Sequence, residues 1–487
     1  MSIFTKQSVS ALRLEAERGG LRRSLGRLDL TALGVGSIIG TGIFVLTGTA
    51  ASQNAGPALV VSMVIAAVAC AFAGLCYAEL ASMIPVAGSA YTYAYATVGE
   101  LFAWIIGWDL ILEYAVSMST IAVGWSGYFV SLVRDLGWDV PAALAAAPGV
   151  PVTTAAGGVV SGVFNAPAAV VVLLVSALLV IGIRESADAN TVLVLIKSLV
   201  LVVFVAAGVA YMRRDNLTPF IPPNAGEFGR FGWSGILRGS AVMFFAYIGF
   251  DAVSTAAQEA KHPQRDLPFG ILTSLALCTV LYIAVGTVLI GIVPYAKLNV
   301  ADPIAVGVEA TGLTWFSPVV KVSAVFGLFS TMLVQLLGQT RIFYSMSRDG
   351  LLPPLFGRVH RKFRTPHVST ILTGGAVAVA AGLLPLTTLS HLVSMGTLLA
   401  FTLVCIGIVI LRRTAPDLER PFRTPGMPWV PLFGAVVCVA QMVGLPWETW
   451  VRLIVWLALG LAIYAGYGRS HAVAMREDRS LAPAAAD

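Results

Sequence analysis

The stretch Gly34-Val35-Gly36-Ser37-Ile38-Ile39-Gly40-Thr41-Gly42 places four glycines inside the first apolar segment of the chain. A continuous helix pairs its backbone groups internally, so a ligand site made of backbone groups requires an interruption at membrane depth. Glycine lowers the cost of unwinding and lets a ligand approach the main chain. The alternative is that Gly36 and Gly40 form a small-xxx-small packing face, although packing does not require Gly34 and Gly42 as well. We therefore expect a broken first helix.

The two sides of this break offer opposite partners to a ligand. If the helix restarts near Thr41 and Gly42, its free amides and positive dipole end suit a carboxylate. The carbonyls left over around Ile38 suit an ammonium group. A zwitterion satisfies both sides at once, so the stretch predicts a site for an α-amino acid.

Composition places the rest of the chain in a lipid bilayer. Only 11% of the residues are charged and 57% are hydrophobic, whereas about a quarter of a soluble protein is charged. The net charge of +6 is spread over short connections rather than gathered on one face, which does not favour nucleic acid as a partner. The five cysteines lie in apolar segments, so we expect neither a disulfide framework nor a metal site.

Apolar runs, compared with the roughly 20 residues needed to cross a bilayer, predict about twelve transmembrane helices. They fall near 29–52, 58–83, 100–132, 167–183, 191–212, 235–258, 267–293, 317–345, 368–384, 388–411, 429–445 and 449–467. The first and sixth carry unusual glycine-rich or polar centres and are five helices apart, which is typical of an inverted repeat of five plus five helices. We therefore expect an all-α polytopic membrane protein. Its parts would be a first repeat at 29–212, a second at 235–411, additional helices at 429–467, and end segments at 1–28 and 468–487.

The distribution of Lys and Arg predicts the orientation, because basic residues in short loops resist translocation. With the N-terminus inside, most basic residues of the connections are cytoplasmic. The outer connections then hold only Arg134, Arg213, Arg214, Arg230, Arg238 and Lys297. We expect a multi-pass protein of the cell membrane with both termini in the cytoplasm.

The sixth segment contains a second candidate break, Phe244-Phe245-Ala246-Tyr247-Ile248-Gly249-Phe250-Asp251. Gly249 permits the helix to open. A carboxylate at Asp251 is expensive in lipid, so it is expected to face a cavity or a partner, as a candidate for binding substrate or a proton. The alternative is that Asp251 only ties down a helix end near the cytoplasmic side.

Two further charged residues lie inside apolar segments. Lys197 is about six residues, or about 9 Å of helix, from the inner end of the fifth segment, a long reach for snorkelling back to water. Burial would make its charged form costly, so Lys197 is a candidate for loading and releasing a proton. Glu113 in the third segment is either a proton or substrate partner or a fixed structural hydrogen-bond acceptor.

The eighth segment carries Ser330, Thr331, Gln335 and Gln339. The two glutamines are four residues apart and share a helix face, so Gln335 could line the side-chain pocket. The hydroxyls of Ser330 and Thr331 could coordinate sodium, although such hydroxyls more often bond to their own helix.

Signatures of soluble enzymes are missing from the sequence. There is no Gly-Lys-Ser/Thr phosphate loop, and the histidines do not cluster with carboxylates at metal-ligand spacing. We expect no enzyme activity, no cofactor and no metal, and transport energy from an ion gradient. Whether a small accessory membrane subunit joins the protein stays open.

Several motifs in order resemble the amino acid permeases of the amino acid/polyamine/organocation superfamily. They are Gly36 to Phe44, Pro85-Val86-Ala87-Gly88-Ser89-Ala90-Tyr91-Thr92-Tyr93, Phe244 to Asp251, and Ser347-Arg348-Asp349-Gly350-Leu351-Leu352-Pro353. The resemblance runs from about Leu21 to Arg469 and is strongest to bacterial relatives of the cationic amino acid transporters.

This resemblance implies a LeuT-like fold with broken first and sixth helices and two peripheral helices. It implies that amides around Thr41 and Gly42 bind the substrate carboxylate. It also implies that backbone carbonyls from both breaks bind the amino group, and these are the carbonyls of Ile38, Phe245, Ala246 and Ile248. Phe245 would also act as a gate. Lys197 matches a lysine that stands where sodium-coupled relatives bind sodium, which implies proton coupling.

The choice of substrate depends on the side-chain pocket. A lysine or arginine substrate would need an acidic partner, and the neighbourhood of Gln335 and Leu336 offers none. Glu113 could serve only if it faces the pocket. We expect proton-coupled symport of small neutral L-amino acids such as alanine, by alternating access. The alternatives are a cationic amino acid transporter, an amino acid exchanger, and an amino acid sensor or channel without coupled transport.

Overall fold

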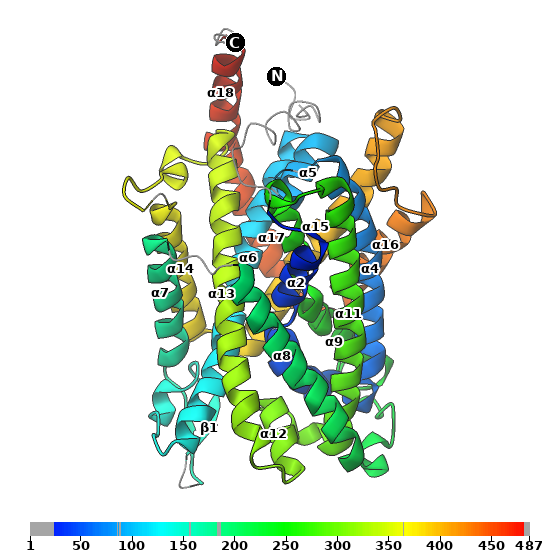
Figure 1. Cartoon of the computed structure of the whole chain (residues 1–487), viewed down its shortest axis with the longest axis vertical. Helices are drawn as coiled ribbons and strands as arrows, with labels where there is room; N and C mark the ends of the chain where they lie inside the picture. The colour runs from blue at the N-terminus through cyan, green and yellow to red at the C-terminus, as the bar shows by residue number, and fades with distance from the viewer. Residues whose placement is uncertain are drawn as a thin grey trace.

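A computed structural model describes residues 24–84, 86, 89–154, 157–182, 187–363 and 365–481. Most of the N-terminal segment predicted at 1–28 lies outside these residues, as do Pro85, Ala87 and Gly88 of the second motif. Within the described part, nearly every residue outside the connections is helical, and the helices run roughly along the long axis (Figure 1).

The first half of the chain supplies the following helices: α2 (Arg27–Ile38), α3 (Thr47–Ala50), α4 (Leu59–Met83), α5 (Ser89–Thr97), α6 (Glu100–Asp135), α7 (Ala166–Ile181), α8 (Ala187–Gly208) and α9 (Gly232–Tyr247). The second half supplies α10 (Ala252–Thr255), α11 (Pro263–Ile292), α12 (Pro303–Ala310), α13 (Phe316–Arg348), α14 (His367–Leu383), α15 (Leu386–Thr414), α16 (Trp429–Gly444), α17 (Trp447–Ile463) and α18 (Arg469–Leu481).

Eight helical stretches of the described chain are long and apolar enough to cross a membrane. They are Arg27–Met83, Glu100–Asp135, Thr191–Tyr211, Gly232–Thr255, Pro263–Ile292, Phe316–Arg348, Leu386–Thr414 and Trp447–Met475. Three shorter apolar helices are α7, α14 and α16. The stretch Arg27–Met83 includes both the first and second predicted segments. The protein is therefore mostly helical with helices suited to cross a membrane, while the count of about twelve spans and the inverted repeat stay predictions.

Some elements were not expected from the sequence. A two-stranded antiparallel sheet joins β1 (Pro151–Thr153) to β2 (Val159–Ser161) in the connection after α6. The short helix α12 precedes α13, and the predicted C-terminal tail contains α18. We call the end of the bundle that carries β1 and α12 the hairpin side, and the end that carries α5 and α18 the termini side (Figure 1).

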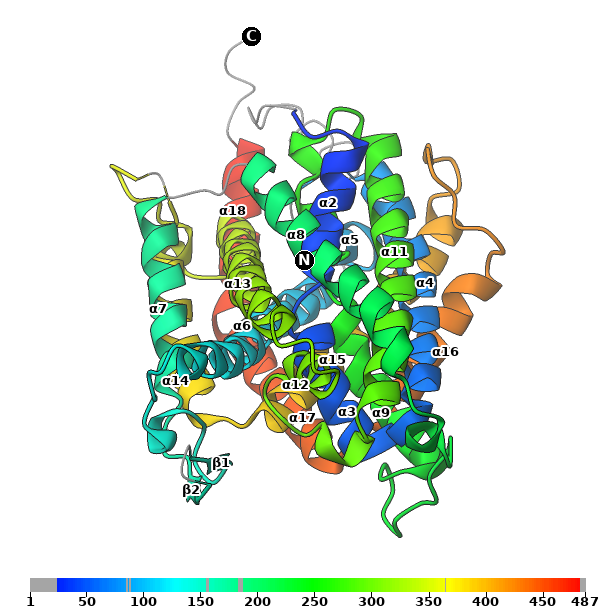
Figure 2. The same ribbon diagram turned by 60° about the horizontal axis from the view of Figure 1, so that its bottom comes forward.

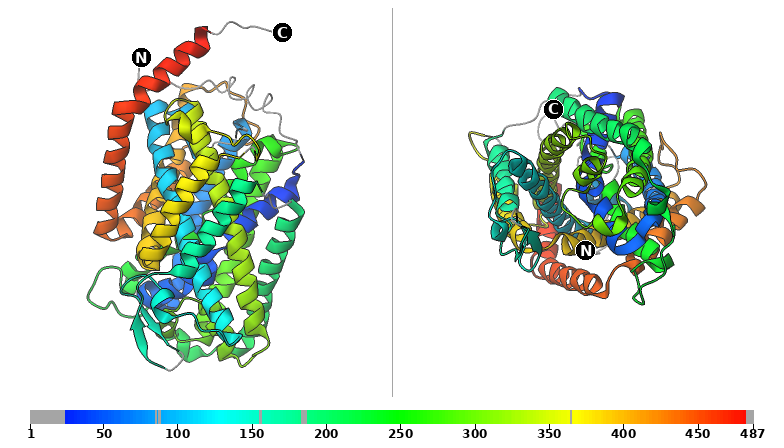
Figure 3. Two further views of the ribbon diagram at one scale, coloured as in Figure 1. Left: turned by 90° about the vertical axis from the view of Figure 1, so that its left-hand side faces the viewer. Right: turned by 90° about the horizontal axis from the view of Figure 1, so that it is seen from below.

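Long helices pack in pairs around the first segment. The pairs with the most extensive contact are α13 with α6 and α11 with α4, and α2 packs on α11 and α8. Seen along the bundle axis, α16 and α17 lie at the outer edge (Figure 3). Side chains of α17 nevertheless reach α6, because the indoles of Trp108 and Trp456 stack 4.5 Å apart and each donates to the other residue's carbonyl.

Candidate functional site

The first predicted break is present in α2. Its helix ends at Ile38, Ile39 has an extended backbone with ψ of 93°, and a π-helical turn begins at Gly42. Figure 2 shows α2 and α3 at successive levels of the bundle, and the break lies between α2 and the π-helical turn that leads into α3. The amides at the start of the second part have no preceding turn to bond to, so the positive end of that part points into the break.

The second predicted break is present between α9 and α10. Ile248 is extended with ψ of 136°, and Gly249 has φ of +128°, a conformation that side chains with a Cβ rarely adopt. The carbonyl end of α9 and the start of α10 therefore meet at residues 248–251, where the first amides of α10 donate to the carbonyls of Gly249, Phe250 and Asp251.

The two breaks lie directly against each other. A Cβ added to Gly249 would stand 2.7 Å from the carbonyl carbon of Ser37, and one added to Gly42 would stand 2.2 Å from the Cα of Ala246. Glycine at both positions is therefore what allows the two main chains to touch.

Residues from both breaks, α6 and α13 enclose a small cavity of about 10 Å³. Its described lining consists of Ser37, Ile38, Gly40, Thr41, Gly42, Ser117, Ile121, Phe245, Ile248, Thr331 and Gln335, none of which is charged. This volume is about that of one water molecule. An amino acid therefore fits only after a lining side chain moves.

Polar groups at the break have distinct partners. The hydroxyl of Thr41 is buried and has no hydrogen-bond partner among the described residues. The carbonyl of Ile38 accepts a hydrogen bond of 2.7 Å from the hydroxyl of Tyr282 and keeps a second lone pair. The amide of Gln335 donates to the hydroxyl of Ser117 at 3.4 Å.

Lys197 lies at the C-terminal end of α2, the first part of the broken helix. Its ammonium donates to the carbonyls of Gly36 and Ile39, the latter at 2.8 Å, and lies 3.5 Å from the hydroxyl of Thr331. The side chain is 1% exposed, so it does not snorkel to water. The Thr331 hydroxyl also donates to Gly327 of its own helix, as expected of a helical threonine.

The other predicted residues lie around this centre rather than in it. Ala246 packs behind Gly42 and does not line the cavity. Glu113 is buried one helical turn from Ser117 and lines neither cavity near the break. Asp251 is buried and accepts a hydrogen bond of 3.4 Å from Tyr114. Ser330 is also buried and does not line the cavity.

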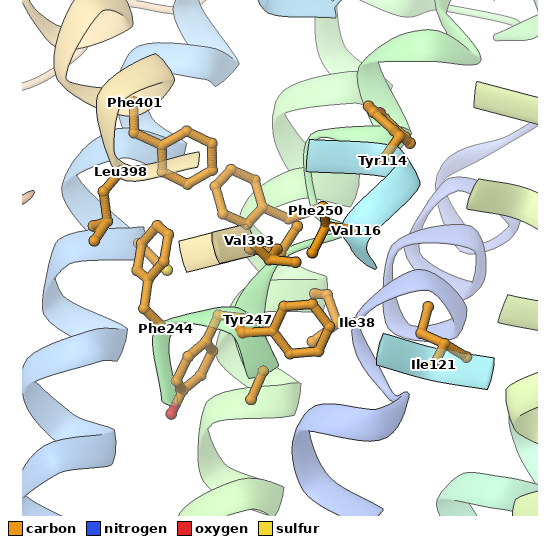
Figure 4. Close-up of a cluster of buried hydrophobic side chains, with 14 of the residues drawn as sticks. Ile38, Tyr114, Val116, Ile121, Phe244, Tyr247, Phe250, Val393, Leu398 and Phe401 are labelled. Atoms are coloured by element: carbon orange, nitrogen blue, oxygen red, sulfur yellow. The ribbon is translucent and has the colours of Figure 1, made fainter. Parts of the chain in front are cut away.

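Aromatic rings support the second break from behind. Phe244, Tyr247 and Phe250 gather with Phe401 of α15 (Figure 4). The ring of Phe401 lies 5.4 Å from Phe244 and 5.2 Å from Phe250. This packing fixes the turn in which Gly249 adopts its positive φ.

Sequence reasoning missed Ser117, Ile121 and Tyr282. Ser117 lies four residues after Glu113, so a search for one polar face of α6 would have indicated it, whereas the apolar Ile121 carries no polar signal. Tyr282 carries no such signal, because its role depends on how α11 packs against α2.

A second cavity of about 230 Å³ lies on the termini side of the break. Ser37, Thr331 and Gln335 line both cavities, and Arg341 and Glu259 line only the larger one. The small cavity is therefore separated from the larger one by the side chains that the two share.

Comparisons with known proteins identify the family of the chain. The family model for amino acid permeases matches residues 25–463. The chain is 45% identical to the methylthioribose transporter of Bacillus subtilis, over 97% of this chain and 99% of that protein. It is 46% identical to the branched-chain amino acid permease BcaP of the same organism, over 96% and 98%. It is 39% identical to the vacuolar cationic amino acid transporter 4 of Arabidopsis thaliana, over 85% and 68%. The chain belongs to the amino acid permease family.

Proposed function

We propose that the protein is a proton-coupled symporter of neutral aliphatic L-amino acids, alanine and the branched-chain amino acids included, that works by alternating access. The observation that carries the proposal is the contact of two broken helices around an uncharged cavity. Backbone donors and acceptors at helix ends suit the zwitterionic part of an amino acid, which is common to all of them.

Each side of the first break has its own role in this proposal. The amides around Thr41 and Gly42, with the unpartnered Thr41 hydroxyl, bind the carboxylate. The carbonyls of Ile38 and Ile248, with those of Phe245 and Ala246, bind the ammonium group. Phe245 lines the cavity and is the gate that moves when substrate enters.

The side-chain pocket favours a neutral substrate over a cationic one. Burying a guanidinium or ammonium without an acidic partner is costly, and no described lining residue is acidic. The relative named as a branched-chain permease supports a neutral aliphatic substrate, and it widens our expectation beyond alanine. The relative named for methylthioribose makes this uncharged sugar the competitor to test.

Lys197 is the proposed proton-coupling group. Its ammonium binds the carbonyls at the C-terminal end of α2, together with Thr331, which is where a bound cation would otherwise be held. When Lys197 releases its proton, these carbonyls lose their charged partner and α2 is free to move. A protein-supplied cation at this position favours proton over sodium coupling.

The experiment is uptake of labelled leucine, alanine, arginine and methylthioribose into proteoliposomes, with proton and sodium gradients imposed separately. We expect accumulation of leucine and alanine under a proton gradient, and its loss in Lys197→Ala. Accumulation driven by sodium alone would contradict the coupling. Counterflow without net uptake would identify an exchanger, and binding without transport would identify a sensor.

A further inference from the structure

A second carboxyl group lies on α6 one turn before Glu113. Asp109 is 1% exposed, and neither of its carboxyl oxygens has a hydrogen-bond partner among the described residues. One oxygen of Glu113, Oε2, is also buried without a partner. Residues four apart share a helix face, so the two carboxyls lie within side-chain reach of each other.

Consecutive residues of α15 face this pair. A Cβ added to Gly396 would stand 2.9 Å from Oδ1 of Asp109, so the carboxyl group packs directly on the glycine backbone. The next residue, Thr397, lies within hydrogen-bonding reach of Glu113. Gly396 is therefore the residue that leaves room for the Asp109 carboxyl.

The charges around the pair do not neutralise it. Among the described residues, no basic side chain hydrogen-bonds to either carboxyl oxygen of Asp109. Glu113 is within electrostatic range of Asp109 and of Asp251, whose carboxylate contacts Tyr114.

The other helices packed at this level present uncharged groups. They are Gln339 of α13, which donates to the carbonyl of Ile111, Trp456 of α17, which stacks on Trp108, and the titratable phenol of Tyr77 of α4, within electrostatic range of Glu113. Three acids therefore share one buried region.

This arrangement stabilises a protonated carboxyl at Asp109. A buried carboxylate without a partner is costly, and a second negative charge nearby adds to that cost. Protonated Asp109 carries an O–H that needs an acceptor, and Glu113 has a buried oxygen without a donor.

We propose that Asp109 is a proton-binding residue that exchanges one proton with Glu113, in space that Gly396 provides. In the exchange, the O–H bond at Asp109 breaks and an O–H bond at Glu113 forms, so the negative charge moves one helical turn. The inference deepens the proposed proton coupling and rests on it for its role in transport. The competing interpretation is that Asp109 is a permanently neutral acid that only packs against α15.

The test is infrared difference spectroscopy of the full-length protein in lipid, following carboxylic-acid C=O absorbance across a pH titration. The variants are Asp109→Asn, Glu113→Gln and Gly396→Ala. The matched control is Ser119→Ala, which removes a buried hydroxyl of the same helix that donates to backbone carbonyls.

In the wild type, we expect two coupled titrating signals. Asp109→Asn should remove the Asp109 signal and shift the Glu113 signal. Glu113→Gln should remove the Glu113 signal and shift the Asp109 signal. Gly396→Ala should shift the Asp109 signal. Ser119→Ala should change neither. An Asp109 signal that stays protonated at every pH, or one that neither Glu113→Gln nor Gly396→Ala shifts, would overturn the proposal.

Transport then separates this inference from the proposed function. We expect proton-driven leucine accumulation to fall at least about tenfold in Asp109→Asn, equivalent to about 1.4 kcal/mol. If the wild type shows no proton-driven accumulation while both carboxyls titrate as a pair, the proposed coupling fails and the proton exchange stands. Unchanged accumulation in Asp109→Asn, with coupling intact in the wild type, would overturn the role of Asp109.

Discussion

The two ends of the bundle differ in how far they close off the central break. On the hairpin side, several contacts close over it: the hydroxyl of Tyr128 donates to the carbonyl of Phe44 at 2.7 Å, and Asn54 donates to the carbonyl of Gly229 at 2.9 Å. Lys321, which is 3% exposed, forms ion pairs at 2.7 Å and 3.0 Å with two acids of neighbouring elements. On the termini side, the cavity of about 230 Å³ reaches the break.

Ion pairs are present at both ends of the bundle, and on the termini side the closest among the described residues, Arg412 with the buried Glu79 at 2.6 Å, does not line the cavity. Lys321 joins Asp135 at the end of α6 to Glu309 of α12, so it fastens the short helix α12 to the bundle. On the termini side, Arg341 and Glu259 are 3.4 Å apart and about a third exposed, which makes their contribution small. If the termini are cytoplasmic, as the basic residues predict, this structure is an inward-facing state and the hairpin side is the closed outer gate.

The largest effect on transport is expected at the contact between the two helix breaks. Gly249→Ala forces a Cβ against the backbone of Ser37 at a φ of +128°, so the two breaks can no longer touch. We expect leucine uptake to fall at least about tenfold, because strain of this kind costs about 1–3 kcal/mol. Gly375→Ala is the control, since a Cβ there meets nothing within 4 Å. Uptake by Gly249→Ala at the wild-type rate would show that the contact is not required.

The next largest effect is expected from removing the ion pairs of Lys321. Lys321→Gln should loosen α12 and let the hairpin side open more often. The reporter is Val45→Cys, because Val45 is fully buried and faces Gly124 across the closed region. We expect an impermeant thiol reagent to label it roughly three to ten times faster, because such pairs contribute on the order of 1 kcal/mol. Lys297→Gln, an exposed lysine on the same side, should leave labelling unchanged; an equal increase there would contradict the specific role of Lys321.

Tyr128→Phe tests a single hydrogen bond of the closed side. Without the hydroxyl, the carbonyl of Phe44 stays buried and loses this donor, which costs on the order of 1 kcal/mol. We expect labelling of Val45→Cys to rise about twofold to fivefold. A rate equal to that of the parent would show that helix packing, rather than this bond, keeps the hairpin side closed.

The smallest effect is expected on the termini side. Arg341→Gln removes one long, partly exposed ion pair next to an existing cavity. We expect initial leucine uptake to stay within about twofold of the wild type. A loss as large as that of Gly249→Ala would mean that Arg341 acts on the substrate or on closure of this side.

The helices and both breaks were predictable from the sequence because their signals are local. Apolar length identifies a spanning segment, and glycine clusters such as Gly34 to Gly42 identify backbone that is easily unwound. The helix α12 and the β1–β2 sheet lie in connections and α18 lies in the C-terminal tail, outside the apolar segments from which helices were predicted. An ion pair of Lys321 with Glu309 holds α12 to the bundle, and sequence spacing does not indicate such a contact.

Much of the site depends on which helix face points inward. Lys197 was singled out because a lone charge in an apolar run is rare, but its partners at Gly36 and Ile39 could not be read from spacing. Asp109 and Ser117 share one face of α6 with Glu113 at spacings of four residues, but that spacing does not show which face of this long helix points inward. Packing of α6 against α13 and α15 makes that distinction.

In the proposed function, the two breaks together bind the zwitterionic part of an amino acid. The most direct measurement is an experimental structure of the protein in lipid with bound leucine. We predict a carboxylate at the amides around Thr41 and Gly42, an ammonium group at the carbonyls of Ile38 and Ile248, and a side chain beside Phe245 and Gln335. Leucine bound only in the termini-side cavity, away from both breaks, would contradict the claim.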